Sequence, residues 1–66
     1  MRVDYDNLYE VLDTVMALGY VVQVKNDFFR RKIFTLFSED GLRITSFRIG
    51  DRVEIKGKRV LVYRQV

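Results

Sequence analysis

The sequence predicts an α+β fold, in which one N-terminal amphipathic helix is followed by a four- to five-stranded antiparallel meander that can curl into a partial barrel. Two observations carry this prediction. Apolar residues recur with a helical period up to Gly19, and beyond Gly19 they alternate with a period of two. Short turn signals separate the alternating runs, as hairpins require. With no linker or repeat, residues 1–66 are expected to form one domain.

Residues 4–18 are expected to form the helix, because their apolar side chains fall within one half of a helical wheel. Asp4 or Asp6 can cap its start, since a carboxylate there accepts hydrogen bonds from free backbone amides. Gly19 can adopt the left-handed conformation that commonly ends a helix. The helix therefore presents an apolar face to a core and an acidic face to the outside.

The remaining residues are expected to form five strands joined by short turns. Asp40–Gly41, Gly50–Asp51 and Gly57–Lys58 are typical of two-residue hairpin turns. The expected strands cover residues 20–25, 29–37, 42–49, 52–55 and 59–65. With two-residue turns, the register of each strand pair follows by counting outward from the turn.

This register predicts which side chains share each face of the sheet. Phe34 is placed opposite Phe47, and Arg48 opposite Val53. One face then forms a core, with Ile33, Thr35, Phe37, Ile44, Ser46, Val53, Ile55, Val60 and Val62. The other face mixes rings, aliphatic side chains and cations, with Lys32, Phe34, Leu36, Arg43, Thr45, Phe47, Ile49, Arg52, Lys56, Arg59, Leu61 and Tyr63. A single helix covers only one face, so the other is expected to meet a partner unless the sheet closes on itself.

The composition argues against catalysis. The chain has no Cys and no His, so it lacks thiolate nucleophiles, the side chain that serves most acid–base chemistry, and the common zinc ligands. The sequence contains no phosphate-binding glycine loop, nucleophile elbow or metal-ligand spacing. We therefore expect no catalytic residue, no cofactor and no metal site. A carboxylate-dependent enzyme would need a deep pocket that holds a perturbed Asp or Glu.

Targeting and membrane signals are also missing from the sequence. Its start has no apolar run after a basic residue, and no stretch approaches the ~20 apolar residues of a membrane span. A cytoplasmic protein that does not contact membranes is expected.

Charge is divided unevenly along the chain. Residues 1–27 carry five acidic and two basic side chains, whereas residues 28–66 carry four acidic and ten basic side chains. The formal net charge of +3 therefore combines an acidic first part with a basic remainder. Such asymmetry is a hint about charged partners rather than about the fold.

A nucleic acid, either DNA or RNA, is the leading expected partner. Bases stack on aromatic rings while cations follow phosphates, and the second sheet face offers both kinds of side chain. The expected contact residues are Arg30, Arg31, Lys32, Phe34, Arg43, Phe47, Arg52, Lys56, Lys58, Arg59 and Tyr63. The ordinary alternative is that these rings fill a core or a dimer contact and that the charges protect strand edges.

A protein-interaction module is the second expectation, either a regulator or inhibitor of a larger protein or a homodimer subunit. Phe28 and Phe29 would then be buried contact residues. The exposed helix face would steer the partner with Asp6, Glu10 and Asp13. Solubility and helix-dipole complementarity explain the same three carboxylates, so the sequence leaves the partner open.

Overall fold

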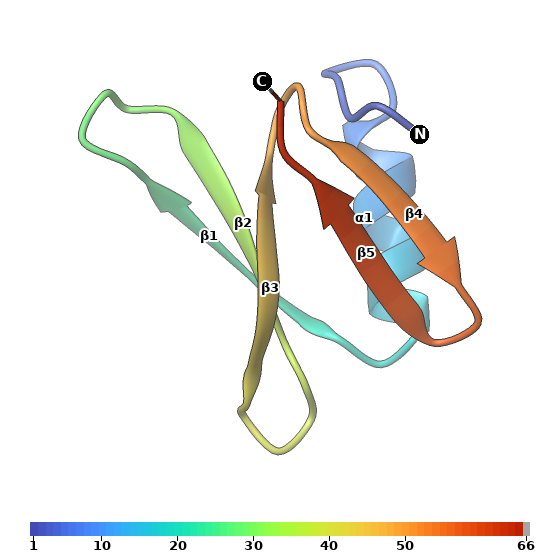
Figure 1. Cartoon of the computed structure of the whole chain (residues 1–66). Helices are drawn as coiled ribbons and strands as arrows, with labels where there is room; N and C mark the ends of the chain where they lie inside the picture. The colour runs from blue at the N-terminus through green and yellow to red at the C-terminus, as the bar shows by residue number, and fades with distance from the viewer. Residues whose placement is uncertain (66) are drawn as a thin grey trace.

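The structure, a computed structural model that describes residues 1–65, contains one helix and five strands in two antiparallel sheets (Figure 1). Helix α1 is followed by five strands, with bounds α1 Leu8–Ala17, β1 Val21–Asn26, β2 Lys32–Phe37, β3 Arg43–Arg48, β4 Arg52–Lys56 and β5 Arg59–Tyr63. β1, β2 and β3 form a three-stranded sheet, and β4 and β5 form a separate hairpin. The α+β class is confirmed. The single meander is wrong, and the described strands form no closed barrel.

Helix α1 is shorter than predicted, because the chain before it is held in a turn. The carboxylate of Asp4 accepts hydrogen bonds from the amides of Asp6 and Asn7, at 2.9 and 3.0 Å. This carboxylate caps the preceding turn, and the helix itself begins at Leu8. After the helix, Gly19 has a φ of 100°, the left-handed conformation that was expected there.

β2 and β3 pair in the predicted register at their centre. Phe34 lies opposite Phe47, as expected. The turn between the strands is longer than two residues, because the amide of Ser38 donates to the carbonyl of Leu42 across it, at 2.8 Å. A register shift near the end of β2 accommodates the longer turn.

β3 and β4 belong to different sheets, so the predicted hairpin between them, which placed Arg48 opposite Val53, is wrong. The N-terminal residues pair with the start of β4 instead. The amide of Val3 donates to the carbonyl of Asp51 at 2.8 Å, and the amide of Val53 donates to the carbonyl of Met1 at 2.7 Å. Because these backbone groups are taken, β4 leaves β3 and pairs with β5. The two-residue turn between β4 and β5 is as predicted, with Lys56 opposite Arg59.

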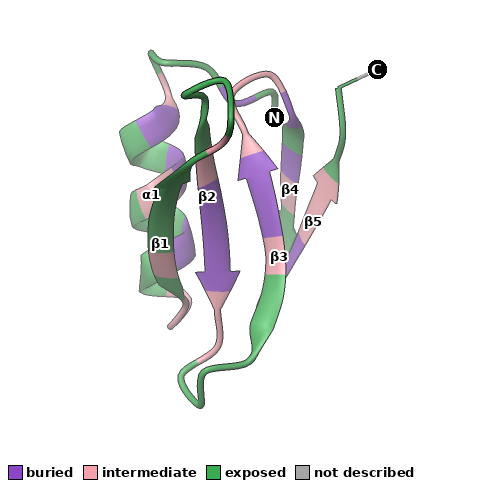
Figure 2. Cartoon of the chain, turned by 90° about the vertical axis from the view of Figure 1, so that its left-hand side faces the viewer, coloured by how far each residue is buried: buried purple, intermediate pink, exposed green. Residues whose placement is uncertain are grey.

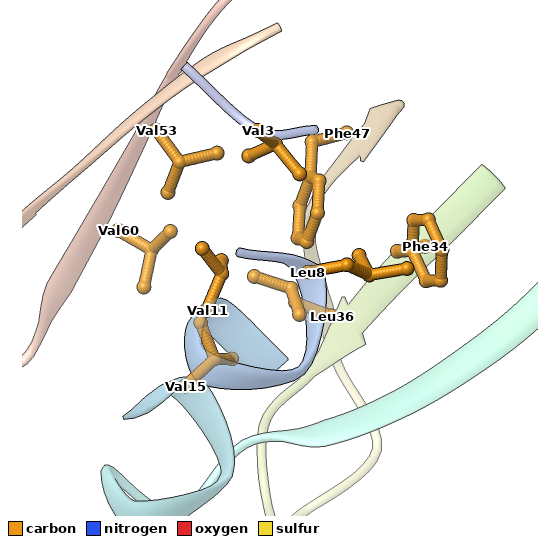
Figure 3. Close-up of a cluster of buried hydrophobic side chains, with 9 residues drawn as sticks. All are labelled: Val3, Leu8, Val11, Val15, Phe34, Leu36, Phe47, Val53 and Val60. Carbon is orange, nitrogen blue, oxygen red and sulfur yellow. The ribbon is translucent and has the colours of Figure 1, made fainter. Parts of the chain in front are cut away.

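One core joins the helix, both sheets and the N-terminal segment (Figure 3). Its buried apolar side chains are Val3, Leu8, Val11, Val15, Phe34, Leu36, Phe47, Val53 and Val60. The predicted core face is therefore right for β4 and β5, which bury Val53 and Val60. It is inverted for the apolar side chains of β2 and β3, which bury Phe34 and Phe47, although Thr35 and Ser46 of the predicted face are buried as well. The inversion follows from the missing β3–β4 hairpin. Because β3 and β4 are not paired, knowing which side of the β4–β5 hairpin is buried does not determine which side of the three-stranded sheet is buried.

Burial is uneven within the three-stranded sheet. Figure 2 shows buried positions along the centres of β2 and β3, whereas β1 is exposed over nearly its whole length. α1 lies on one side of this sheet and leaves the other side open (Figure 2). No helix among the described residues has the length and apolar character that crossing a membrane requires.

Candidate functional site

The face of the three-stranded sheet that points away from α1 carries a basic recess. Thr35 on β2 and Ser46 on β3 lie opposite each other in its lining and are only 7% and 5% exposed. The recess has a volume of about 630 Å³, and its basic lining residues are Lys25, Arg43, Arg48 and Arg64. No carboxylate lines this recess in the described part of the chain, so its chemistry suits an anion.

A second recess continues the first toward the β1–β2 loop. Its volume is about 490 Å³, and it shares Arg48 and Arg64 with the first recess. Tyr5, with 74% of its surface exposed, also lines it. We call the combined surface the cationic face and define it by Lys25, Arg30, Arg31, Lys32, Arg43, Arg48 and Arg64. Cations that are far apart in the sequence thus form one surface.

Asp27 holds the β1–β2 loop at the edge of the cationic face. Its carboxylate accepts hydrogen bonds from the amides of Phe29 and Arg31, both at 2.8 Å, and from the guanidinium of Arg48 at 2.5 Å. The amide of Arg31 lowers the pKa of Asp27 below its ordinary value; partial burial opposes this shift, and the Arg48 guanidinium adds to it. The carboxylate therefore stays ionised at neutral pH and ties β3 to the loop.

Arg30 occupies a strained position in this loop. Its φ of 61° is left-handed, which is uncommon for a residue other than Gly, Asn or Asp. The amide of Arg30 donates to the carbonyl of Asp27 at 3.0 Å and closes the turn. A cation at a position where glycine is more stable suggests that its side chain serves a purpose other than folding.

Asp51 fixes the other end of the cationic face. Its carboxylate, in a residue only 4% exposed, accepts hydrogen bonds from the amides of Arg48 and Gln65, both at 3.0 Å. It also lies 3.7 Å from the guanidinium of Arg64. These contacts connect the end of β3 to the chain after β5, and the guanidinium groups of Arg48 on β3 and of Arg64 after β5 line the same recess.

The two rings that were predicted to stack on bases lie in the core, so this part of the predicted site is wrong. Phe34 and Phe47 are 2% and 0% exposed, and their stacked rings have centroids 5.3 Å apart. Because both rings are packed inside the core, they have no ring face to offer a ligand. Arg43 was expected beside them, but the register shift pairs it with Phe37 and places it on the cationic face.

The basic residues of the β4–β5 turn lie far from the β1–β2 loop (Figure 1). Lys56, Lys58 and Arg59 are exposed, and the carbonyl of Lys58 accepts a hydrogen bond from the hydroxyl of Tyr20 at 2.6 Å. Glu39 lines the same shallow recess as Lys58 near the end of α1. The structure therefore does not bring these three predicted residues to the cationic face.

Arg52 and Tyr63 lie beside the cationic face on the β4–β5 hairpin. The guanidinium carbon of Arg52 is 4.6 Å from the centre of the Tyr63 ring, and both residues line a recess of about 380 Å³ that also includes Arg64. Arg52 pairs with Glu54 at 3.5 Å, which offsets part of its charge. These two predicted residues are neighbours of the site rather than its centre.

The residues predicted for a protein interface fall into two separate places. Phe28 and Phe29 are 94% and 70% exposed in the β1–β2 loop, directly before Arg30. Glu10 and Asp13 are exposed on α1, and Asp6 is exposed in the turn that precedes it. The two phenylalanines are therefore neighbours in the chain of the cations in the β1–β2 loop, whereas Glu10 and Asp13 belong to a different element of the fold.

Sequence reasoning missed four residues of this surface: Tyr5, Lys25, Arg48 and Arg64. Tyr5 was counted with the apolar half of a longer helix. The three cations are isolated in the sequence, and only strand pairing brings them together, because Ile33 lies between Lys25 on β1 and Arg48 on β3. A correct assignment of the sheet faces would have found Lys25 and Arg48.

Comparison with protein-family models, with curated proteins and with solved structures finds no match. Residues 1–65 contain no group of side chains suited to hold a metal ion. The function must therefore be inferred from the geometry and charge of this chain alone.

Proposed function

We propose that this protein is a small, non-enzymatic module that binds nucleic acid through its cationic face. The observation that carries the proposal is the convergence of seven cations from the β1–β2 loop, all three strands of one sheet and the C-terminal segment on one surface. The two carboxylates of this region, Asp27 and Asp51, are already engaged by backbone amides and by arginines. The surface therefore keeps a positive surplus that matches a phosphate backbone.

The acidic side of the molecule is compatible with this mode of binding. Glu10 and Asp13 lie on α1, on the far side of the sheet from the cationic face, whereas Asp6 lies in the turn before α1, next to Tyr5. A nucleic acid on the open face would be kept away from the charges of Glu10 and Asp13. The net charge of +3 consequently understates the attraction for a nucleic acid, because seven basic side chains are concentrated on the cationic face.

Salt-dependent binding tests the proposal. A labelled 20-nucleotide single strand and its duplex are titrated with protein at 50 and 200 mM salt. Four neutralised phosphates on a single strand correspond to roughly a 50-fold loss of affinity over this range, because counterions are released on binding. Absence of binding at 50 mM salt would contradict the proposal.

Two triple variants with equal charge changes localise the contact. Replacing Arg30, Arg31 and Lys32 with Ala is expected to weaken binding at least tenfold and to reduce the salt slope by about two, as expected for three lost phosphate contacts. Replacing Lys56, Lys58 and Arg59 with Ala removes the same charge from the distant turn and is expected to change affinity less than threefold. Equal losses in the two variants would mean that overall charge, and not the cationic face, drives binding.

A second candidate function, association between two copies of the chain, rests on β1. In the described residues β1 pairs with β2 only, and Val21 and Val24 are 57% and 51% exposed at its free edge. Unprotected edges of this kind add strands from other chains. Light scattering at micromolar concentration distinguishes this function: a dimer that persists at high salt supports it, and a monomer excludes it.

A further inference from the structure

The β1–β2 loop presents two aromatic rings to solvent in a defined geometry. Phe28 and Phe29 are 94% and 70% exposed, and their ring centroids lie 5.4 Å apart with the ring planes at 85°. The guanidinium carbon of Arg31 lies 5.2 Å from the centre of the Phe29 ring. Phe29 thus contacts both a ring and a cation, while Phe28 is left with almost all of its surface free.

This exposure belongs to an ordered loop. Asp27 accepts two amide hydrogen bonds from inside the loop and pairs with Arg48 on β3. A backbone hydrogen bond from the amide of Asp27 to the carbonyl of Arg31, at 2.8 Å, closes the loop at its base. The backbone that carries the rings is therefore tied to the sheet, and a ligand would not have to order this backbone when it binds.

We propose that the Phe28–Phe29 loop is a stacking site for unpaired bases, which makes single-stranded nucleic acid the preferred ligand of the cationic face. This inference rests on the proposed function and identifies the form of nucleic acid that is bound. Arg30, Arg31 and Lys32 follow the rings directly, so a base on Phe28 would place its own phosphates beside cations.

The chemistry of the loop favours bases over other flat or apolar partners. An apolar protein surface would have to cover the flanking cations, whereas a nucleotide carries a ring for Phe28 and a phosphate for Arg30. In a duplex the base faces are already stacked on their neighbours, so an exposed ring finds a free base face only on a single strand or at a distorted site. Tyr5, in the recess next to Arg30, offers a further exposed ring to a following base.

Substitution of Phe28 gives the first test, by fluorescence. The chain has no Trp, so Phe28→Trp introduces a single indole reporter at the centre of the site. Stacking on oligo-dT or oligo-dA of 12 nucleotides is expected to quench its emission by half or more at saturation. A blunt 12-bp duplex at equal occupancy is expected to change the emission by less than a tenth. Binding of the single strand with unchanged emission would overturn the proposal.

A matched series of variants separates stacking from general apolar contact. Phe28→Ala is expected to weaken single-strand binding by about 5- to 150-fold, the range for the loss of one stacked base. Phe28→Leu keeps an apolar side chain and is expected to lose nearly as much, whereas Phe28→Tyr keeps the ring and is expected to stay within about twofold. Tyr9→Ala removes an aromatic side chain that is 78% exposed on α1 and is expected to have no effect. Full retention of affinity in Phe28→Leu would contradict stacking.

Failure of this inference is distinguishable from failure of the proposed function. Binding that depends on Arg30, Arg31 and Lys32 but is equal for single strand and duplex, and is unchanged in Phe28→Ala, would overturn only the stacking site. A third arm uses vesicles with 30% phosphatidylserine. Phe28-dependent binding to these vesicles, together with no binding to either oligonucleotide, would assign the loop to an anionic lipid surface and overturn both proposals.

Discussion

Two pairs of phenylalanines in this chain have similar ring separations in opposite environments. Phe34 and Phe47 stack with centroids 5.3 Å apart and are almost fully buried in the core. Phe28 and Phe29 meet edge to face with centroids 5.4 Å apart and are 94% and 70% exposed on the β1–β2 loop. The first pair is formed across two paired strands, and the second within a turn that Asp27 ties to the sheet. Ring content alone therefore does not identify a binding site, because position relative to the helix decides which rings are free.

The difference in burial implies that one pair contributes to folding stability and the other to binding. Removing the inner pair should destabilise the fold, and removing the outer pair should leave the fold intact while it weakens binding. Aromatic rings that are exposed next to cations contribute little to the stability of the fold, and they lower the solubility of the protein.

Phe47→Ala is expected to lower the free energy of unfolding by about 3–5 kcal/mol, because it opens a cavity at a fully buried ring. A domain of this size has a total stability of roughly 3–10 kcal/mol, so much of the protein would unfold. Phe28→Ala is expected to change stability by less than about 0.5 kcal/mol, as for an exposed site. Urea denaturation followed by circular dichroism measures both values. Similar losses for the two variants would contradict the contrast.

Asp51→Ala is expected to cost about 2–4 kcal/mol, since it leaves the partly buried amides of Arg48 and Gln65 without this hydrogen-bond acceptor. This variant removes the link between β3 and the chain after β5, so the two parts of the cationic face should separate. Urea denaturation gives the stability, and salt-dependent titration gives the accompanying loss of affinity. A stable Asp51→Ala protein with unchanged affinity would show that this link is unnecessary.

Asp27→Ala tests the matching carboxylate in the exposed loop. Asp27 engages groups of the loop and Arg48, so the variant is expected to loosen the loop and weaken binding with little effect on global stability. Hydrogen exchange of the Phe29 and Arg31 amides measures the loosening. Unchanged exchange at both amides would contradict the role given to this carboxylate.

Acid should act on the loop through the same carboxylate. The pKa of Asp27 in the folded chain lies below its unfolded value, so its stabilising contribution is complete above about pH 4 and is lost as pH falls through the folded pKa. The amide chemical shifts of Phe29 and Arg31 are expected to titrate together below about pH 4. Asp27→Asn serves as the control, and persistence of the titration in that variant would assign it to another group.

Arg30→Gly is expected to produce the smallest and most diagnostic change, a gain in stability together with a loss of binding. Glycine adopts the φ of 61° without strain, which should stabilise the fold by up to about 1 kcal/mol. Loss of the cation should weaken single-strand binding severalfold. Thermal unfolding and anisotropy titration measure the two effects, and a stabilised variant with unchanged affinity would remove Arg30 from the site.

Local patterns allowed a large part of the fold to be predicted. The apolar period and Gly19 located the helix, and the Gly57–Lys58 turn and the Phe34–Phe47 pairing followed from counting. The separation of β3 from β4 was not predictable in this way. It depends on hydrogen bonds from residues 1–3 and on the buried carboxylate of Asp51, and neither contributes to a period of two.

The part of the site that was predictable is mostly the part whose residues are neighbours in the sequence. Arg30, Arg31 and Lys32 were found because they form a run, and Arg43 was found on the wrong grounds, since it was expected beside Phe34 and Phe47. Lys25, Arg48 and Arg64 were not, because strand pairing and the C-terminal segment bring them together. The inverted sheet face also places Phe34 and Phe47 in the core instead of the expected site, whereas Phe28 and Phe29 are exposed.

Amide chemical-shift mapping shows directly which face of the protein a nucleic acid contacts. The ¹⁵N-labelled protein is titrated with a 12-nucleotide single strand at 50 mM salt, and shifts are followed residue by residue. The largest changes are expected in residues 25–32, 43–48 and 63–65, while residues 8–17 and 56–59 stay close to their free values. Changes confined to the helix or to the β4–β5 turn would contradict a ligand on the cationic face.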